Sequence, residues 1–112
     1  MRVDVSLKYL ERSDFIETIL ANDLRKIERR VKMFKKDDPI HISVHIEKNP
    51  KKEQYFCRSH IYLPSSKVLV ADEKGKKAGE AINRAFSALT RQLDKAKYKL
   101  EKRLPRRRAR VK

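Results

Sequence analysis

Six basic side chains recur at spacings of three, four and seven residues in the last third of the chain. They are Lys77, Arg84, Arg91, Lys95, Lys99 and Lys102. On an α-helix these spacings return to one face, so the side chains would form a single row of cations. Like charges four residues apart destabilise a helix slightly, and the only acidic residue near the row is Glu80, at its margin. The row therefore predicts a surface that binds an external polyanion.

Two further groups of basic residues extend this prediction. A row on the exposed side of an earlier helical segment is formed by Arg25, Arg29, Lys32 and Lys36. The end of the chain adds Arg103, Arg106, Arg107, Arg108 and Arg110. Residues 104–112 have too few apolar side chains to fold alone, so we expect a basic, disordered tail. Guanidinium groups match the geometry of phosphates, and the tail lacks the large apolar residues that would enter a lipid bilayer. The expected binding partner is therefore nucleic acid and not a membrane.

The net charge is concentrated in the same part of the chain. The 112 residues carry 30 Lys and Arg against 15 Asp and Glu, for a net charge of +15. Residues 1–73 contribute only +3, whereas residues 74–112 hold fifteen basic and three acidic side chains and contribute +12. A charge gathered in one region indicates a binding footprint, whereas an even distribution would indicate only solubility.

Patterns typical of catalysis, metal binding and membrane insertion are absent from the sequence. With two glycines, Gly75 and Gly79, there is no glycine-rich phosphate loop. His41 and His45 stand four residues apart on a predicted strand, about 13 Å from each other, too far to share a metal ion. Cys57 alternates with inward-facing residues, which predicts a buried thiol and no nucleophile. With no leader and no apolar run, we expect a cytosolic protein, no enzyme, and no cofactor.

Alternating apolar residues predict four strands. They lie at residues 3–7, 40–46, 55–63 and 68–71. On the third strand the outward positions hold Phe56, Arg58, His60 and Tyr62, and His41 and His45 are expected beside them. Aromatic rings with arginine on an open sheet can stack nucleobases. The competing interpretation is a partly exposed sheet with ordinary cross-strand pairs.

Spacings of three and four between apolar residues predict two helices. The first begins after the N-cap residue Ser13 and ends before Pro39. The second begins between residues 74 and 78 and ends near Arg103, because Pro105 is expected to stop it. The predicted fold is α+β in the order β-α-β-β-β-α, a four-stranded sheet with both helices on one face, similar to a double-stranded-RNA-binding domain. The first helix is the one long crossover, so strands one and two can pair in parallel.

The second helix contains a recognisable motif. Ala81-Ile82-Asn83, followed by the run Leu89-Thr90-Arg91-Gln92-Leu93-Asp94-Lys95-Ala96-Lys97, resembles the second helix of ribosome hibernation promoting factors and ribosome-associated translation inhibitors. The string Leu24-Arg25-Lys26-Ile27-Glu28-Arg29 is similar to part of that family's first helix. The order of elements agrees, and the resemblance covers nearly all of residues 1–103. The chain departs from the pattern at Gly79, where the family usually has an aromatic residue, and at Ala88, where it commonly has lysine.

The resemblance implies a bacterial stress-response factor that binds the small ribosomal subunit and its ribosomal RNA. It implies binding in the mRNA and tRNA decoding channel, competition with both RNAs, and a block of translation. The implied organisation is a ribosome-binding domain at residues 1–103 with the tail at 104–112, monomeric off the ribosome, with no small-molecule substrate. The alternative is a general RNA-binding or ribosomal structural protein of the double-stranded-RNA-binding type.

Overall fold

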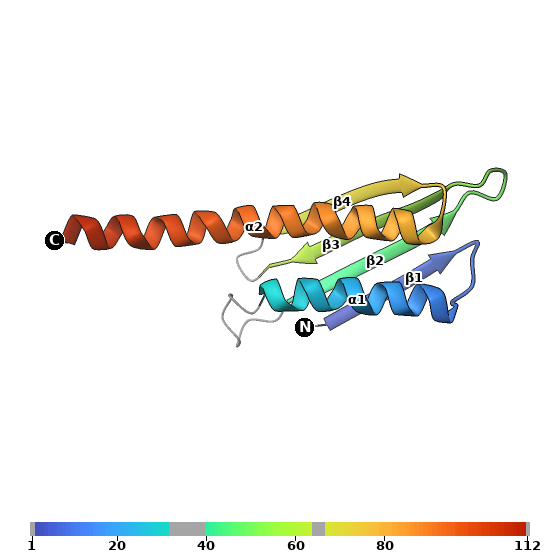
Figure 1. The fold of residues 1–112 in the computed structure, drawn as a ribbon, viewed down its shortest axis with the longest axis horizontal. Coiled ribbons are helices and arrows are strands. Elements are labelled where there is room, and N and C mark those ends of the chain that lie inside the picture. The colour runs from blue at the N-terminus through green and yellow to red at the C-terminus, as the bar shows by residue number, and fades with distance from the viewer. Residues whose placement is uncertain (1, 32–39, 64–66, 112) are drawn as a thin grey trace.

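Six elements follow one another in the predicted order β-α-β-β-β-α (Figure 1). This computed structural model describes residues 2–31, 40–63 and 67–111, with side chains as far as Ala96. The elements are β1 (Arg2–Lys8), α1 (Asp14–Val31), β2 (His41–Lys48), β3 (Tyr55–Tyr62), β4 (Val68–Gly75) and α2 (Ala78–Val111). None of the helices in this part of the chain is long and apolar enough to cross a membrane.

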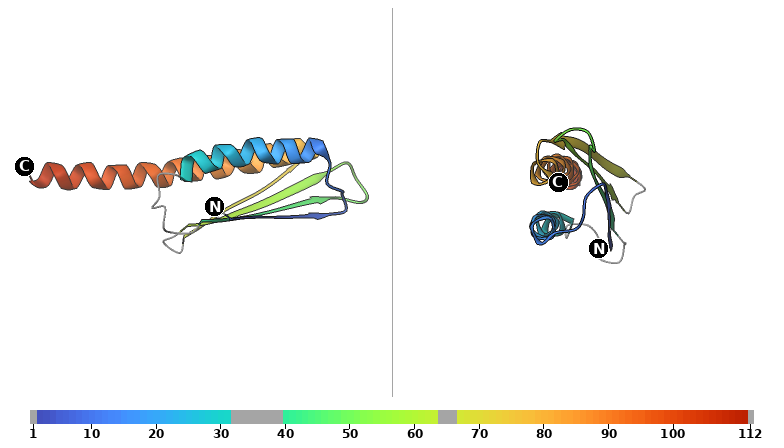
Figure 2. Two further views of the ribbon diagram at one scale, coloured as in Figure 1. Left: turned by 90° about the horizontal axis from the view of Figure 1, so that it is seen from below. Right: turned by 90° about the vertical axis from the view of Figure 1, so that its right-hand side faces the viewer.

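The four strands form one sheet in the order β1-β2-β3-β4. β1 pairs with β2 in parallel, and the other two pairs are antiparallel, as the positions of the turns and the crossover predict. Both helices lie side by side on one face of this sheet, and its other face carries no helix (Figure 2). The predicted α+β fold class and topology are therefore confirmed.

The core lies between the sheet and the two helices. α1 contributes Ile16, Leu20, Ile27 and Val31, α2 contributes Ala81, Ile82, Ala85, Phe86, Leu89 and Leu93, and the sheet contributes Ile42, Val44, Ile46, Cys57, Ile61, Leu69 and Ala71. β1 is covered less well, because Val3, Val5 and Leu7 are only half-buried. The burial periods match the predicted stripes, so apolar spacing decides which helix face meets the sheet.

The beginning of α1 follows the capping prediction. Oγ of Ser13 accepts a hydrogen bond from the backbone N–H of Ile16 at 3.2 Å. This contact satisfies one of the N–H groups that a helix leaves unpaired at its first turn. Asp14 and Glu17 lie in that turn, where negative charge stabilises the helix dipole. The predicted N-cap is thus confirmed.

The end of α2 differs from the prediction. The helix continues past Pro105 to Val111, so the prediction that it ends near Arg103 is wrong. Proline removes one backbone hydrogen bond from a helix, but the Leu, Arg and Ala residues around it are strong helix formers. The division of the chain into a domain at 1–103 and a basic tail at 104–112 stays a prediction.

β4 is longer than the predicted strand at 68–71. It continues to Gly75 because it pairs with β3 along its whole length, from Tyr62 opposite Val68 to Tyr55 opposite Gly75. The charged residues 72–74 have low strand propensity by themselves. Cross-strand partners override that preference, because Asp72 lies opposite Arg58.

Side chains of α2 bind the backbone of β4. Nε2 of Gln92 donates a hydrogen bond to the carbonyl oxygen of Val70 at 2.8 Å, and Nη1 of Arg84 donates one to that of Lys74 at 2.9 Å. β4 is an edge strand, and only β3 pairs with it in the sheet. The two contacts attach α2 along the sheet edge.

Candidate RNA-binding surface

Three residues of the predicted row lie on the described part of α2, and Lys77 directly precedes the helix. All four side chains are exposed: Lys77, Arg84, Arg91 and Lys95. The opposite side of the helix holds Ile82, Leu89 and Leu93, which are fully buried, so the row points away from the core. The remaining predicted cations of this region lie in the later turns of α2, where the structure describes the backbone but not the side chains. They are Lys99, Lys102, Arg103, Arg106, Arg107, Arg108 and Arg110. Their contacts with RNA stay predictions.

α1 adds two exposed cations, Arg25 and Arg29. Ile27 between them is fully buried, so both arginines point outward from the same layer as the row on α2. Lys32 and Lys36 lie in residues 32–39, outside the described residues. We call the exposed side of the two helices, with Arg25, Arg29, Lys77, Arg84, Arg91 and Lys95, the helical face. Because both helices lie on the same face of the sheet (Figure 2), the described cations of the two predicted rows lie on one side of the molecule.

Arg84 is less available to bind an external anion than the sequence suggests. Its Nη2 lies 2.7 Å from Oε1 of Glu80, one turn earlier, while Nη1 binds the carbonyl of Lys74. The marginal Glu80 therefore balances one charge of the row and helps to hold Arg84 against β4. Arg91 and Lys95 have no ion-pair partner among the side chains that the structure describes. These two are the stronger candidates for an external anion.

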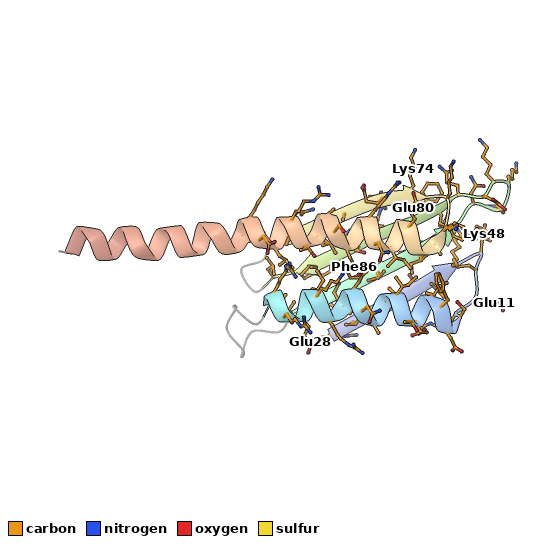
Figure 3. The ribbon with its side chains drawn as sticks, in the orientation of Figure 1. Glu11, Glu28, Lys48, Lys74, Glu80 and Phe86 are labelled. Atoms are coloured by element: carbon orange, nitrogen blue, oxygen red, sulfur yellow. The ribbon has the colours of Figure 1, made fainter. Side chains whose placement is uncertain are left out.

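A groove runs between the two helices and contributes residues that the sequence prediction missed. It is lined by Asp23, Lys26, Arg30, Phe86, Ser87, Thr90 and Arg91. Phe86 lies between α1 and α2 (Figure 3). Lys26 and Arg30 recur at helical spacing on the side of α1 that faces α2, which was the available signal. Three cations and two hydroxyl groups at one groove suit the oxygens of a phosphate backbone.

Within this groove, Arg30 and Asp23 have different surroundings. Nε of Arg30 lies 3.2 Å from Oδ1 of Asp94 and so links the two helices. Asp23 is 6% exposed, its Oδ2 has no hydrogen-bond partner among the described residues, and Nζ of Lys26 lies 3.9 Å from its Oδ1. Burial raises the pKa of the Asp23 carboxyl, and the positive charge of Lys26 partly opposes that rise.

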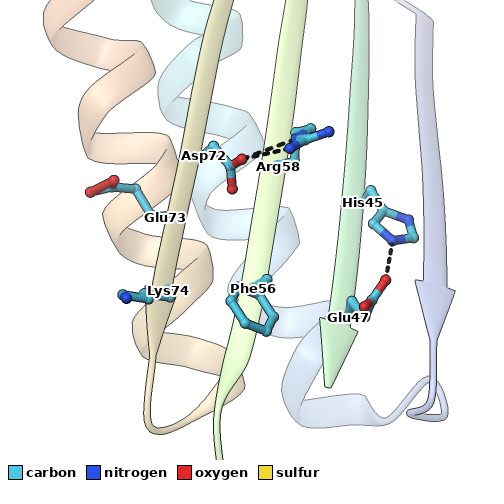
Figure 4. Close-up of a pocket in the computed structure, with 7 residues that line it drawn as sticks. All are labelled: His45, Glu47, Phe56, Arg58, Asp72, Glu73 and Lys74. Carbon is cyan, nitrogen blue, oxygen red and sulfur yellow. Dashed lines mark hydrogen bonds and ion pairs between the residues drawn. The ribbon is translucent and has the colours of Figure 1, made fainter. Parts of the chain in front are cut away.

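The open side of the sheet has the predicted composition, and several of its basic side chains contact carboxylates. This sheet face holds His41, His45, Phe56, Arg58, His60 and Tyr62. Both Nε and Nη2 of Arg58 donate to Oδ2 of Asp72, at 3.1 and 2.8 Å (Figure 4). His41 contacts Asp4, and His45 contacts Glu47. The ring of Tyr62 is stacked between those of His41 and His60, with centroids 5.4 and 6.1 Å away.

The thiol of Cys57 is buried, as the alternation on β3 predicts. Its side chain is fully shielded from solvent, and burial raises its pKa to about 11. A hydrogen bond with Oγ of Ser59, at 3.7 Å, opposes that rise, and the negative charges of Asp23 and Asp72 add to it. At neutral pH the thiol is therefore protonated and poorly nucleophilic. In the described part of the chain, no group of three His, Cys, Asp or Glu side chains is placed to hold a metal ion.

Comparison with known proteins places this geometry in a family. Residues 3–110 match the family described as Sigma 54 modulation protein / S30EA ribosomal protein. No curated protein matches the chain.

Two solved structures have a similar fold. The Protein Y N-terminal domain from Thermus thermophilus aligns with a TM-score of 0.67 and 20% identity, over 85% of this chain and 98% of that one. A ribosomal subunit interface protein from Coxiella burnetii aligns with a TM-score of 0.66 and 16% identity, over 88% of this chain and 99% of that one. At these identities the two structures support the fold alone. The family match covers nearly the whole chain, and the chain belongs to the Sigma 54 modulation protein / S30EA ribosomal protein family.

Proposed function

We propose that this protein is a ribosome hibernation factor. It binds the small ribosomal subunit in the channel that mRNA and tRNA occupy during decoding, and blocks translation under stress or in stationary phase. The observation that carries the proposal is the helical face, where Arg25, Arg29, Arg91 and Lys95 are exposed without carboxylate partners among the described side chains. The family match supports the ribosome as the source of the anion, as does the similar fold of the ribosomal subunit interface protein from Coxiella burnetii.

The mechanism is steric and involves no catalysis. A domain held by one core presents cations from both helices at positions fixed by packing, so it binds RNA phosphates without large rearrangement. Contacts with phosphates position a protein without reading sequence, so the site is recognised by the shape of folded ribosomal RNA. While bound, the protein excludes mRNA and tRNA. It acts in the cytoplasm as a monomer when it is off the ribosome.

Binding of this kind releases counter-ions, so the affinity falls steeply with salt. If about six phosphates are engaged, the affinity is expected to fall by roughly three orders of magnitude between 50 and 200 mM salt. The measurement is a filter-binding titration with vacant small subunits at several salt concentrations. A flat salt dependence would show that phosphate contacts do not hold the complex.

Co-sedimentation with vacant ribosomes tests the assignment directly. At low salt we expect the protein in the small-subunit and whole-ribosome fractions, and its displacement when mRNA and tRNA are added. Protein left at the top of the gradient would refute ribosome binding. Equal binding to naked RNA duplexes and to actively translating ribosomes would support the general double-stranded-RNA-binding alternative.

A further inference from the structure

Aromatic side chains gather at the end of the molecule where both helices begin. Tyr9, Phe15 and Tyr55 line one depression there, which lies between the β1–α1 connection, the beginning of α2 and the ends of β2 and β3. Tyr9 is 59% exposed and Phe15 is 67% exposed, the highest values for large apolar side chains in the described part of the chain. Lys48 and Glu11, labelled in Figure 3, mark this end, which we call the aromatic end.

Local packing holds the two exposed rings in place. A Cβ added at Gly79 would lie 3.6 Å from Cε1 of Phe15 and 2.8 Å from Cδ1 of Ile19, so α1 approaches α2 closely at this glycine. Tyr9 has a φ of 63°, a conformation that bulky L-residues rarely adopt. Neither ring belongs to the buried core. Both rings are therefore exposed to solvent, that of Phe15 on a helix that packs closely against α2.

Lysines surround these rings. Nζ of Lys8 lies 5.2 Å from the centroid of the Tyr9 ring, and Nζ of Lys48 lies 5.8 Å from that of Tyr55. Lys76 and Lys77 line the same depression. Against these four cations stand two carboxylates, Glu11 and Glu53. The aromatic end thus combines flat, exposed rings with an excess of positive charge.

We propose that the aromatic end binds an unpaired nucleotide of ribosomal RNA. Its base stacks on Phe15 and Tyr9, and the flanking phosphates lie against Lys76 and Lys77. Exposed aromatic rings beside cations are the usual means of holding single-stranded nucleic acid, because every base has a face that can stack and every linkage carries a negative charge. An apolar peptide or a lipid tail would gain nothing from the four lysines.

This inference rests on the proposed function and deepens it. Lys77 belongs to both the helical face and the aromatic end, so the two surfaces are continuous. The helical face would bind folded RNA through its phosphates, whereas the aromatic end requires a base that is free of its own stack. The complex would therefore need a ribosomal site where folded RNA lies beside an unpaired base.

A fluorescent reporter tests the proposal. The chain has no tryptophan, so Phe15→Trp introduces a single indole at the aromatic end. A base stacked on an indole quenches its emission, and we expect quenching both with a short single-stranded RNA at low salt and with vacant small subunits, which hold no mRNA. Tyr62→Trp on the sheet face is the matched control, expected to keep its emission. Unchanged emission of the Phe15→Trp variant with the oligonucleotide would overturn the proposal, whatever happens on the ribosome.

Affinity gives the second measurement. The double substitution Tyr9→Asn and Phe15→Ser removes both rings while leaving residue 9 able to adopt positive φ. We expect binding to small subunits to weaken about tenfold, with an unchanged dependence on salt. Wild-type affinity in this variant would overturn the inference and leave the proposed function standing. A blue shift and higher emission of the Phe15→Trp variant on subunits would also overturn it, because that result indicates contact with a ribosomal protein.

Discussion

The helical face and the sheet face both carry basic side chains, and they differ in how those charges are balanced. On the sheet face, Arg58 forms two hydrogen bonds with Asp72, and His41 contacts Asp4. On the helical face, Arg91 and Lys95 have no such partners among the described side chains. The fold therefore neutralises Arg58 internally, on the side that we expect to stay in solvent. On the other side it retains repulsion that an external anion would relieve.

Charge reversal on the helical face should have the largest effect. Arg91→Glu with Lys95→Glu removes two unpaired cations and adds two repulsive charges. We expect affinity for small subunits to fall at least about a hundredfold at moderate salt. The measurement is filter binding, with circular dichroism to check that the fold persists. Arg84 is left unchanged because it also binds Glu80 and the backbone of Lys74.

A matched control reverses the same number of charges elsewhere. Lys51→Glu with Lys67→Glu changes the net charge by the same amount at two exposed positions outside both helices, neither with an ion-pair partner among the described side chains. This variant should lose only the modest affinity that follows from net charge. Equal losses in the two double variants would contradict the distinction between the faces and leave only general electrostatic attraction.

Substitution of Asp23 should have an effect of intermediate size, on the free energy of unfolding. Because burial raises the folded-state pKa of this carboxyl above its ordinary value of 3.8, the charged form is disfavoured in the fold. Its contribution to stability is present below about pH 3.8 and is lost as the pH rises through the folded-state pKa. Asp23→Ala should therefore be more stable than wild type by about 1 kcal/mol at pH 7, with the gain vanishing in acid.

Urea unfolding at several pH values measures this difference. Asn22→Ala is the control, because Asn22 is the exposed neighbour on the same helix and reports the helix propensity of alanine alone. A gain for Asp23→Ala that matches the control at every pH would show that the unpartnered Oδ2 does not destabilise the fold.

The sheet face should give the smallest effect. Arg58→Gln combined with Asp72→Asn removes an ion pair whose side chains are 60% and 50% exposed. Exposed pairs contribute less than about 1 kcal/mol, so the unfolding free energy should change little. Binding to small subunits should not change. A large loss of affinity in this variant would assign the sheet face a role in RNA binding. The helical face would then not be the only binding surface of the two.

The sequence predicted the elements wherever apolar spacing was regular. The apolar stripes that contain Ile27 and Leu89 correctly predicted both helices and their buried sides. Ser13 correctly predicted the start of α1. Two boundaries were wrong because tertiary or neighbouring context overrides local preference. β4 is extended by its pairing with β3, and α2 continues past Pro105.

The candidate site was predicted only in part, for a related reason. Helical geometry identifies which side chains point away from a core, and it placed Arg91 and Lys95 correctly in solvent. It does not reveal partners from other elements, so the contact of Arg84 with the backbone of Lys74 was missed. The groove cations Lys26 and Arg30 were also missed, because the position of one helix beside the other depends on packing that a single helix does not encode.

The contact between Gln92 and the backbone of Val70 has a consequence for how this chain avoids self-association. Exposed strand edges allow identical chains to add to one another, and crowding favours such polymerisation. A side-chain amide that occupies an edge carbonyl denies an incoming strand its hydrogen-bond partner. The same helix that carries the exposed cations Arg91 and Lys95 thus protects one margin of the sheet from self-assembly.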